Sequence, residues 1–115
     1  MNLYICTMIQ NDSIIALATP SGIGAISVIR ISGEDAIDIL SKFFTSKSGK
    51  ILKNQKTHTI HLGHIIDNLR IIDEVLVSIF KNPRSYTGEN VVEISCHGSS
   101  FIQQEIIQLF LKNGC

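Results

Sequence analysis

Two stretches of the sequence repeat apolar residues at the spacing of an amphipathic helix, and this constrains the fold more than any other feature. Residues three and four apart share one face of a helix, so each stretch carries a single apolar stripe. We expect both stripes to be buried against a β-sheet, because a stripe of this kind is stable only on another apolar layer. The stripes comprise Ala36, Ile37, Leu40, Phe43 and Phe44 in residues 35–45, and Phe101, Ile102, Ile106, Leu109 and Phe110 after Ser100.

Capping signals indicate where these two helices begin. Ser32-Gly33-Glu34-Asp35 and Ser100-Phe101-Ile102-Gln103 both have the spacing of a capping box, in which side chains satisfy the free N–H groups of the first turn. Gly114 suits the end of the second helix.

The remaining patterned segments favour strands. Residues 14–18, 25–31, 57–66, 71–80 and 91–96 are rich in β-branched residues, and residues 67–70 suit a hairpin turn. Residues 46–56 have no periodicity and predict a surface loop. The sequence therefore predicts an α+β fold, with two helices on one face of a mixed or antiparallel sheet. We expect one domain over residues 12–115 and a poorly patterned extension over residues 1–11, with Met1–Thr7 outside the folded unit and Met8 near the natural start.

Two charged residues interrupt apolar strands. Alternation places Glu93 with Val91 and Ser95 on one face of its strand, and Arg30 at the end of another apolar stripe. Glu93 is either an edge charge that faces solvent or a lysine, or an acceptor for a ligand with paired N–H donors. Arg30 either reaches the sheet edge along its aliphatic stem or takes part in the same site.

Composition and motifs argue against several functions. The 115 residues have a formal net charge of zero, and their ten basic residues are scattered. Only the lysines of residues 47–56 come close to a patch, and a solvated loop is favoured there over nucleic-acid binding. Three distant cysteines suggest neither disulfides nor zinc, and a reducing, cytoplasmic setting fits them. No apolar run reaches the length of a membrane span.

Recognisable catalytic and metal motifs are missing. Gly22-Ile23-Gly24 lacks the other residues of a phosphate loop. On a strand His61 points away from His58 and His64, so we expect no metal site. Cys96 and His97 are adjacent and point to opposite faces, which predicts a packed thiol and an exposed or hydrogen-bonded imidazole.

Three motifs nevertheless resemble the N-terminal domain of the MnmE (TrmE) family of tRNA-modification GTPases. They are residues 12–33 (Asp-Ser-Ile-Ile-Ala-Leu-Ala-Thr-Pro-Ser-Gly-Ile-Gly-Ala-Ile-Ser-Val-Ile-Arg-Ile-Ser-Gly), residues 85–93 (Ser-Tyr-Thr-Gly-Glu-Asn-Val-Val-Glu) and residues 96–98 (Cys-His-Gly). The resemblance runs from about Asp12 to the end of the chain. It implies a fold similar to that of folate-dependent aminomethyltransferases.

The resemblance also implies a function. Proteins of this family act with MnmG to add a carboxymethylaminomethyl-type group to carbon 5 of the wobble uridine of certain tRNAs, using a one-carbon unit from tetrahydrofolate. The N-terminal domain binds the folate, in a 5-formyl or methylene form, and makes the homodimer. The family's folate-contacting arginine corresponds to Arg30 and its glutamate to Glu93. We expect no catalytic residue in this segment and tRNA contacts mainly elsewhere in the complex.

Some parts of the family pattern fall outside these 115 residues. A further folate-contacting lysine, the helical domain, the GTPase domain that uses GTP, Mg²⁺ and K⁺, and a C-terminal cysteine motif all lie beyond position 115, so we expect a fragment of a longer protein. Ser99 replaces a common glycine and should still cap a helix. Two alternatives stay open: a stand-alone folate-dependent aminomethyltransferase-like protein, and a dimerisation scaffold without folate binding.

Overall fold

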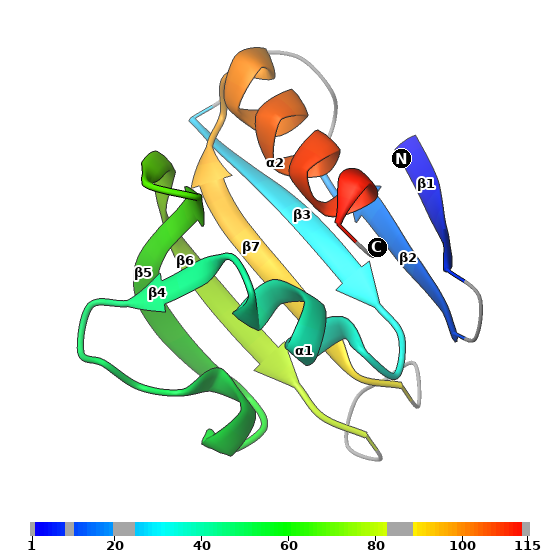
Figure 1. The fold of residues 1–115 in the computed structure, drawn as a ribbon, viewed down its shortest axis with the longest axis vertical. Helices are drawn as coiled ribbons and strands as arrows, with labels where there is room; N and C mark the ends of the chain where they lie inside the picture. The colour runs from blue at the N-terminus through cyan, green and yellow to red at the C-terminus, as the bar shows by residue number, and fades with distance from the viewer. Residues whose placement is uncertain (1, 9–10, 20–24, 83–88, 114–115) are drawn as a thin grey trace.

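A seven-stranded antiparallel sheet forms the body of the protein in the computed structural model (Figure 1). The structure describes residues 2–8, 11–19, 25–82 and 89–113. The strands lie in the order β1-β2-β3-β7-β6-β5-β4, and every neighbouring pair is antiparallel. Their bounds are Asn2–Met8, Asn11–Leu17, Ile26–Ser32, Phe44–Ser46, Thr59–Asp67, Arg70–Phe80 and Val91–His97 for β1 to β7.

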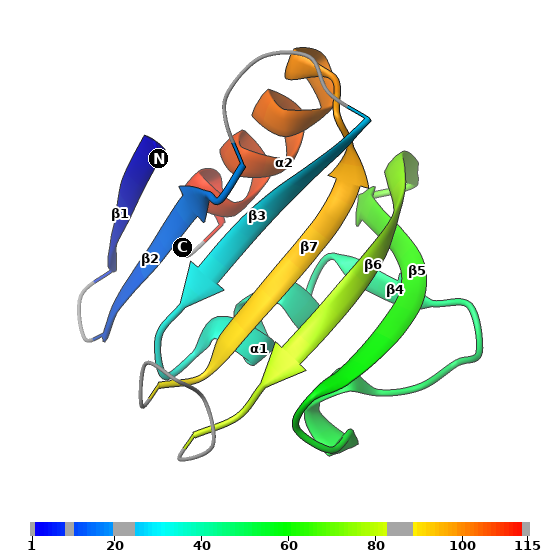
Figure 2. The ribbon, with the colours of Figure 1, turned by 180° about the vertical axis from the view of Figure 1, so that it is seen from behind.

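Two helices, α1 (Ala36–Ser41) and α2 (Ser100–Lys112), lie on the same face of this sheet. Figure 2 shows the opposite face, where β3, β7, β6 and β5 stand in front of both helices. The predicted α+β architecture with two helices on one face is therefore confirmed, and the sheet is antiparallel in all of its described pairs.

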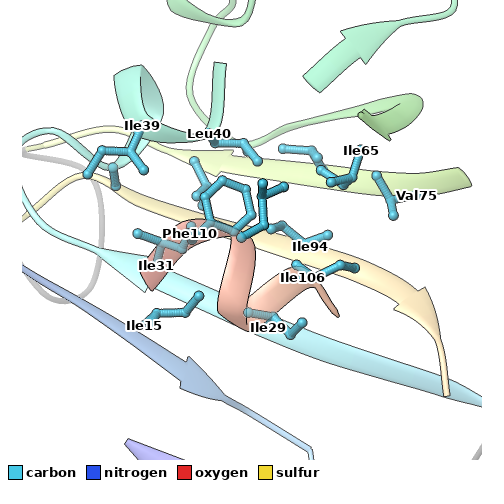
Figure 3. Packing of buried hydrophobic residues seen from close by; sticks show 14 of the residues in the cluster. Ile15, Ile29, Ile31, Ile39, Leu40, Ile65, Val75, Ile94, Ile106 and Phe110 are labelled. Carbon is cyan, nitrogen blue, oxygen red and sulfur yellow. The ribbon is translucent and has the colours of Figure 1, made fainter. Parts of the chain in front are cut away.

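The core fills the space between the helices and the covered face of the sheet. Phe110 of α2 is fully buried in the middle of this cluster, near Leu40, Ile31 and Ile94 (Figure 3). Its ring meets that of Phe43 edge to face, with centroids 5.7 Å apart. Burying an apolar side chain of this kind stabilises a fold by roughly 1.5–3 kcal/mol, so these residues dominate the stability of the domain.

The first helix is shorter than its apolar pattern predicts. It ends at Ser41, and Phe44 already pairs with Ile65 in β4, which is the short edge strand. The predicted helix over residues 35–45 is therefore wrong at its C-terminal end, because pairing with β5 outweighs local helical periodicity. The predicted loop also contains a 3₁₀ turn, Leu52–Asn54, whose Leu52 is buried in the core.

The helix starts also differ from the predicted capping boxes. Ser32 belongs to β3, and the side chain of Asp35, which precedes α1, accepts no capping hydrogen bond from the first turn. In α2 the cap lies one residue earlier than predicted, because the Ile102 backbone N–H donates to Ser99 Oγ at 3.1 Å. The expectation that Ser99 still caps a helix is confirmed, and its φ of −95° needs no glycine.

The N-terminal residues differ most from expectation. Asn2–Met8 forms β1 and pairs with Asn11–Leu17 along its whole length. The expectation that Met1–Thr7 lies outside the folded unit is therefore wrong for Asn2–Thr7, the part of this segment that the structure describes. Backbone hydrogen bonds hold an edge strand whatever its side chains, so a weak pattern did not exclude one. The β-favouring Tyr4, Ile5 and Thr7, followed by turn formers after Ile9, were the available signal.

Candidate functional site

The sheet face without helices carries both charged residues that the sequence singled out. Arg30 of β3 and Glu93 of β7 are direct partners in the register of these two strands. They lie in the middle of the sheet, because β3 and β7 are its third and fourth strands. Glu93 is therefore not an edge charge, and Arg30 does not lie at the edge. Long-range strand pairing has brought together two residues that are 63 positions apart in the sequence.

Arg30 and Glu93 form an ion pair across the two strands. Arg30 Nε and Nη2 donate to the same oxygen, Glu93 Oε2, at 2.8 and 2.5 Å. Their side chains are 27% and 21% exposed, so the pair is reachable from solvent. A pair of this exposure contributes about 0.2–1 kcal/mol to folding, which is small for two charged residues in the centre of a sheet.

The geometry leaves part of each charged group available. Both hydrogen bonds of the guanidinium to Glu93 end on Oε2, and within the described residues Glu93 Oε1 accepts none. Arg30 Nη1 likewise makes no hydrogen bond to that part of the chain. A carboxylate oxygen and a guanidinium N–H thus face the same open surface, one as an acceptor and one as a donor.

Asn90 makes several hydrogen bonds at the end of the sheet where β3 ends and β7 begins. Its backbone oxygen accepts from Gly33 N at 2.9 Å, and its side-chain Nδ2 donates to the Glu34 carbonyl at 3.1 Å. Its Oδ1 accepts from the backbone N–H of Asn82 at 2.9 Å. Asn90 therefore ties three chain segments together just before the strand that carries Glu93.

Gly33 allows the chain to turn out of β3 close to β2. Its φ of 148° is unfavourable for other residues, and an added Cβ would lie 2.6 Å from Ser13 Oγ. Ser13 is buried, and its hydroxyl has no partner in the described part of the chain. The positive φ and the close approach to Ser13 therefore explain why glycine stands at position 33, independently of any ligand.

Cys96 and His97 point to opposite faces of β7, as predicted. Cys96 is buried, and burial together with the nearby Asp73 carboxylate raises the pKa of its thiol to about 12. His97 is exposed, and its Nδ1 lies 2.7 Å from Asp73 Oδ1 while its backbone N–H donates to Asp73 Oδ2. The thiol stays protonated at neutral pH and is not suited to act as a nucleophile.

The three histidines of the β5 region have separate environments. His58 stacks edge to face on Phe80, and His61 is buried with Nε2 2.8 Å from Thr59 Oγ1. His64 lies on the open face beside Glu74, which also pairs with Lys47 at 2.6 Å. No group of three or more histidine, cysteine or acidic residues in the described ranges is arranged to hold a metal ion.

Two sequence motifs cannot be placed. Gly22-Ile23-Gly24 lies outside the described residues, and so does the Ser-Tyr-Thr-Gly part of the second motif, in residues 85–88. Sequence reasoning missed Asn90 and Asp73, because their role depends on which strands lie side by side. The position of Asn90 between a turn signal and a strand was the only hint.

Comparison with known proteins identifies the family. The family model described as the N-terminus of the GTP-binding protein TrmE matches residues 13–115. The chain belongs to this family. It is 65% identical over 108 residues to a protein named tRNA modification GTPase MnmE from Flavobacterium johnsoniae. Proteins of the same name from Christiangramia forsetii and Geobacillus kaustophilus are 60% and 47% identical over 105 and 109 residues.

These matches cover nearly all of the chain but a small part of each relative. The three alignments include 94%, 91% and 93% of the chain, and 23%, 22% and 24% of the relatives. The chain thus spans about a quarter of the length of the curated relatives it matches. The comparison therefore assigns the chain to the N-terminal part of TrmE-type proteins.

Neither helix that the structure describes has the length and apolar run needed to cross a membrane.

Proposed function

We propose that this domain binds a tetrahydrofolate on the uncovered face of its sheet and serves a tRNA-modification GTPase of the MnmE type. The observation that carries the proposal is the Arg30–Glu93 pair in the centre of that face. Both residues sit in the motifs that gave the family resemblance, and the family model covers both positions. Such an ion pair contributes less than about 1 kcal/mol to folding, so the stability of the fold alone does not account for two charged residues at these positions.

The chemistry of a pterin suits Glu93. The 2-amino group of a pterin and its adjacent ring N–H form a pair of parallel donors, and a carboxylate offers two acceptor oxygens at matching spacing. Oε1 of Glu93 accepts no bond from the described residues, whereas Oε2 accepts two from Arg30. We therefore expect Arg30 to release one of these bonds when the ligand binds and to turn its guanidinium toward an oxygen of the ligand.

The test is calorimetric titration with 5-formyltetrahydrofolate. Glu93→Gln replaces one acceptor oxygen by an NH₂ group that faces a ligand N–H, and this should cost about 2–4 kcal/mol of binding. The melting temperature should hardly change, because the carboxylate is partly exposed. Arg30→Ala should also weaken binding, with some loss of stability because the packing of its partly buried side chain is lost.

Glu105→Gln is the matched control. Glu105 also pairs with an arginine, Arg70, at 3.0 Å, but it belongs to α2 and so to the covered side of the sheet. This substitution should leave the affinity unchanged. Equal affinities for wild type and Glu93→Gln, together with a lower melting temperature for the variant, would make Glu93 a structural residue and contradict the proposal.

We further propose that the domain forms a homodimer and that its parent protein acts with MnmG on tRNA. These properties follow from the family resemblance, and a cytoplasmic setting stays a prediction with them. A two-fold dimer uses one surface patch twice. Light scattering that shows only monomer up to millimolar concentration would contradict dimerisation of this chain.

A further inference from the structure

The two edges of the sheet end in different ways. At one edge β4 has only three residues, and the Ser46 carbonyl at its end accepts a hydrogen bond from Gly49 N. At the other edge β1 pairs with β2 along all of its seven residues, Asn2–Met8. A long row of unpaired N–H and C=O groups at a sheet edge can pair with another chain. The β1–β2 edge is therefore the edge that has the length to accept a strand of another molecule.

β1 is held to the rest of the protein through β2. Within the described residues, β2 is the one element with which β1 makes extensive contact. Figure 2 shows β1 as the outermost strand, on the far side of β2 from β3. The family model matches residues 13–115, so β1 lies outside the matched part of the chain. β1 is therefore attached to the outside of the matched fold by a single strand pairing.

The direction of the backbone groups shows what β1 covers. Ala18 N donates to the Val28 carbonyl, so the N–H groups of the even-numbered residues of β2 point toward β3. The N–H groups of Ser13, Ile15 and Leu17 consequently point toward β1. All three residues are buried, and two of them belong to the hydrophobic core. Without β1, unpaired backbone groups would thus lie directly beside the core.

We propose that β1 is a detachable capping strand, which keeps the edge of β2 from pairing with β2 of a second copy of the chain. β1 runs antiparallel to β2, and both strands have seven residues. A two-fold axis perpendicular to the sheet also makes the β2 strands of two copies antiparallel, so a second β2 fits the position of β1. The same axis keeps the helices of both copies on one face of the joined sheet.

The position beside β2 suits a second copy better than the position beside β1. A strand that pairs with β1 lies about 4.8 Å further from the core than one that pairs with β2. The proposed capping is also independent of the folate and of the homodimer proposed above, because that homodimer concerns the intact chain.

The test is light scattering of the full chain and of a chain without residues 1–7, at concentrations at which the full chain is monomeric. β1 is joined to β2 through residues 9–10. A strand tethered so closely competes at an effective concentration of about 1 mM or more, so its removal should lower the dissociation constant of the dimer about tenfold or more. An excess of a peptide of residues 1–7 should return the shortened chain to monomer.

Two proline variants of the full chain form a matched pair. Tyr4 is the register partner of Ile15 and Ile5 that of Ile14, so the Tyr4 N–H points toward β2 and the Ile5 N–H points to the open edge. Tyr4→Pro removes a hydrogen bond to β2 and should raise self-association as the deletion does. Ile5→Pro is the control, because proline is tolerated where the N–H of an edge strand faces solvent, and it should leave the chain monomeric.

Three results would overturn the proposal. The first is a shortened chain that stays monomeric, or that forms large aggregates instead of dimers. The second is a shortened chain that is unfolded by circular dichroism, because β1 would then be an integral strand of the domain. The third is equal self-association of the Tyr4→Pro and Ile5→Pro variants, because the pairing of β1 with β2 would then not control the edge.

Discussion

The two faces of the sheet are built from the same strands but carry different kinds of side chain. On the covered face most positions are buried aliphatic residues, such as Ile29, Ile31 and Ile94. On the uncovered face the alternate positions of the same strands carry Arg30 and Glu93, with serines and exposed apolar residues around them. The buried residues of the covered face stabilise the fold, whereas the side chains of the uncovered face are available to bind a ligand.

This difference predicts that the same kind of substitution has unequal effects on the two faces. Phe110→Ala on the covered side should lower the free energy of unfolding by about 3–5 kcal/mol, because the residue is fully buried and a cavity remains. Leu76→Ala, at a half-exposed position on the other face, should cost less than about 1 kcal/mol. Urea denaturation of both variants checks this, and similar losses would remove the distinction between the faces.

The second largest effect should come from the turn that leaves β3. Gly33→Ala adds a Cβ that would lie 2.6 Å from Ser13 Oγ, at a φ of 148°. We expect a loss of about 2–3 kcal/mol from strain and overpacking. Gly49→Ala is the control, because Gly49 has a φ of 73° but nothing within 4 Å of an added Cβ. If both cost the same, backbone strain alone explains the effect.

Polar pairs on the two faces should also differ. On the covered face Gln103 Nε2 donates to Ser27 Oγ at 2.5 Å, and both residues are buried. Ser27→Ala removes a partner from a buried amide and should cost about 1–3 kcal/mol of stability. Thermal melts measure this. A loss below a few tenths of a kcal/mol would mean that the amide has adequate alternative partners.

The Arg30–Glu93 pair should contribute less to stability. A double-mutant cycle with Arg30→Ala and Glu93→Ala should give a coupling energy of about 0.5–1 kcal/mol in unfolding. The coupling in binding of 5-formyltetrahydrofolate should be larger if both residues contact the ligand. A coupling above about 2 kcal/mol in unfolding, with none in binding, would make the pair structural.

The smallest predicted effect is the pH dependence of stability that comes from His61 on the covered face. Burial lowers the pKa of His61, and Lys50 lowers it further. The folded state therefore binds fewer protons than the unfolded state near pH 6.5, so this histidine contributes stability above that pH and loses it as the pH falls through its folded pKa. Denaturation at pH 7.5 and 5.5 should show a smaller loss for His61→Gln than for wild type. An equal loss would show that other groups control the acid response.

The predictability of the site differs from that of its surroundings. Period-two alternation correctly placed Glu93, Ser95 and Val91 on one face, because the direction of a side chain on a strand depends only on backbone geometry. The same reasoning gave the buried thiol of Cys96 and the exposed His97. It could not give the hydrogen bonds that join Asn90 to Gly33 and Glu34, since these residues are distant from Asn90 in the sequence.

The sequence by itself determined the fold class, the β5–β6 hairpin, the second helix and the two charged residues of the candidate site, because all of these depend on local periodicity and on short motifs. Only the tertiary structure decided that β3 lies beside β7, that the first helix stops at Ser41 and that Asn2–Met8 adds an edge strand. The physical reason is that strand order and element ends depend on the total free energy of contacts between distant segments, whereas alternation depends on the backbone of one segment alone.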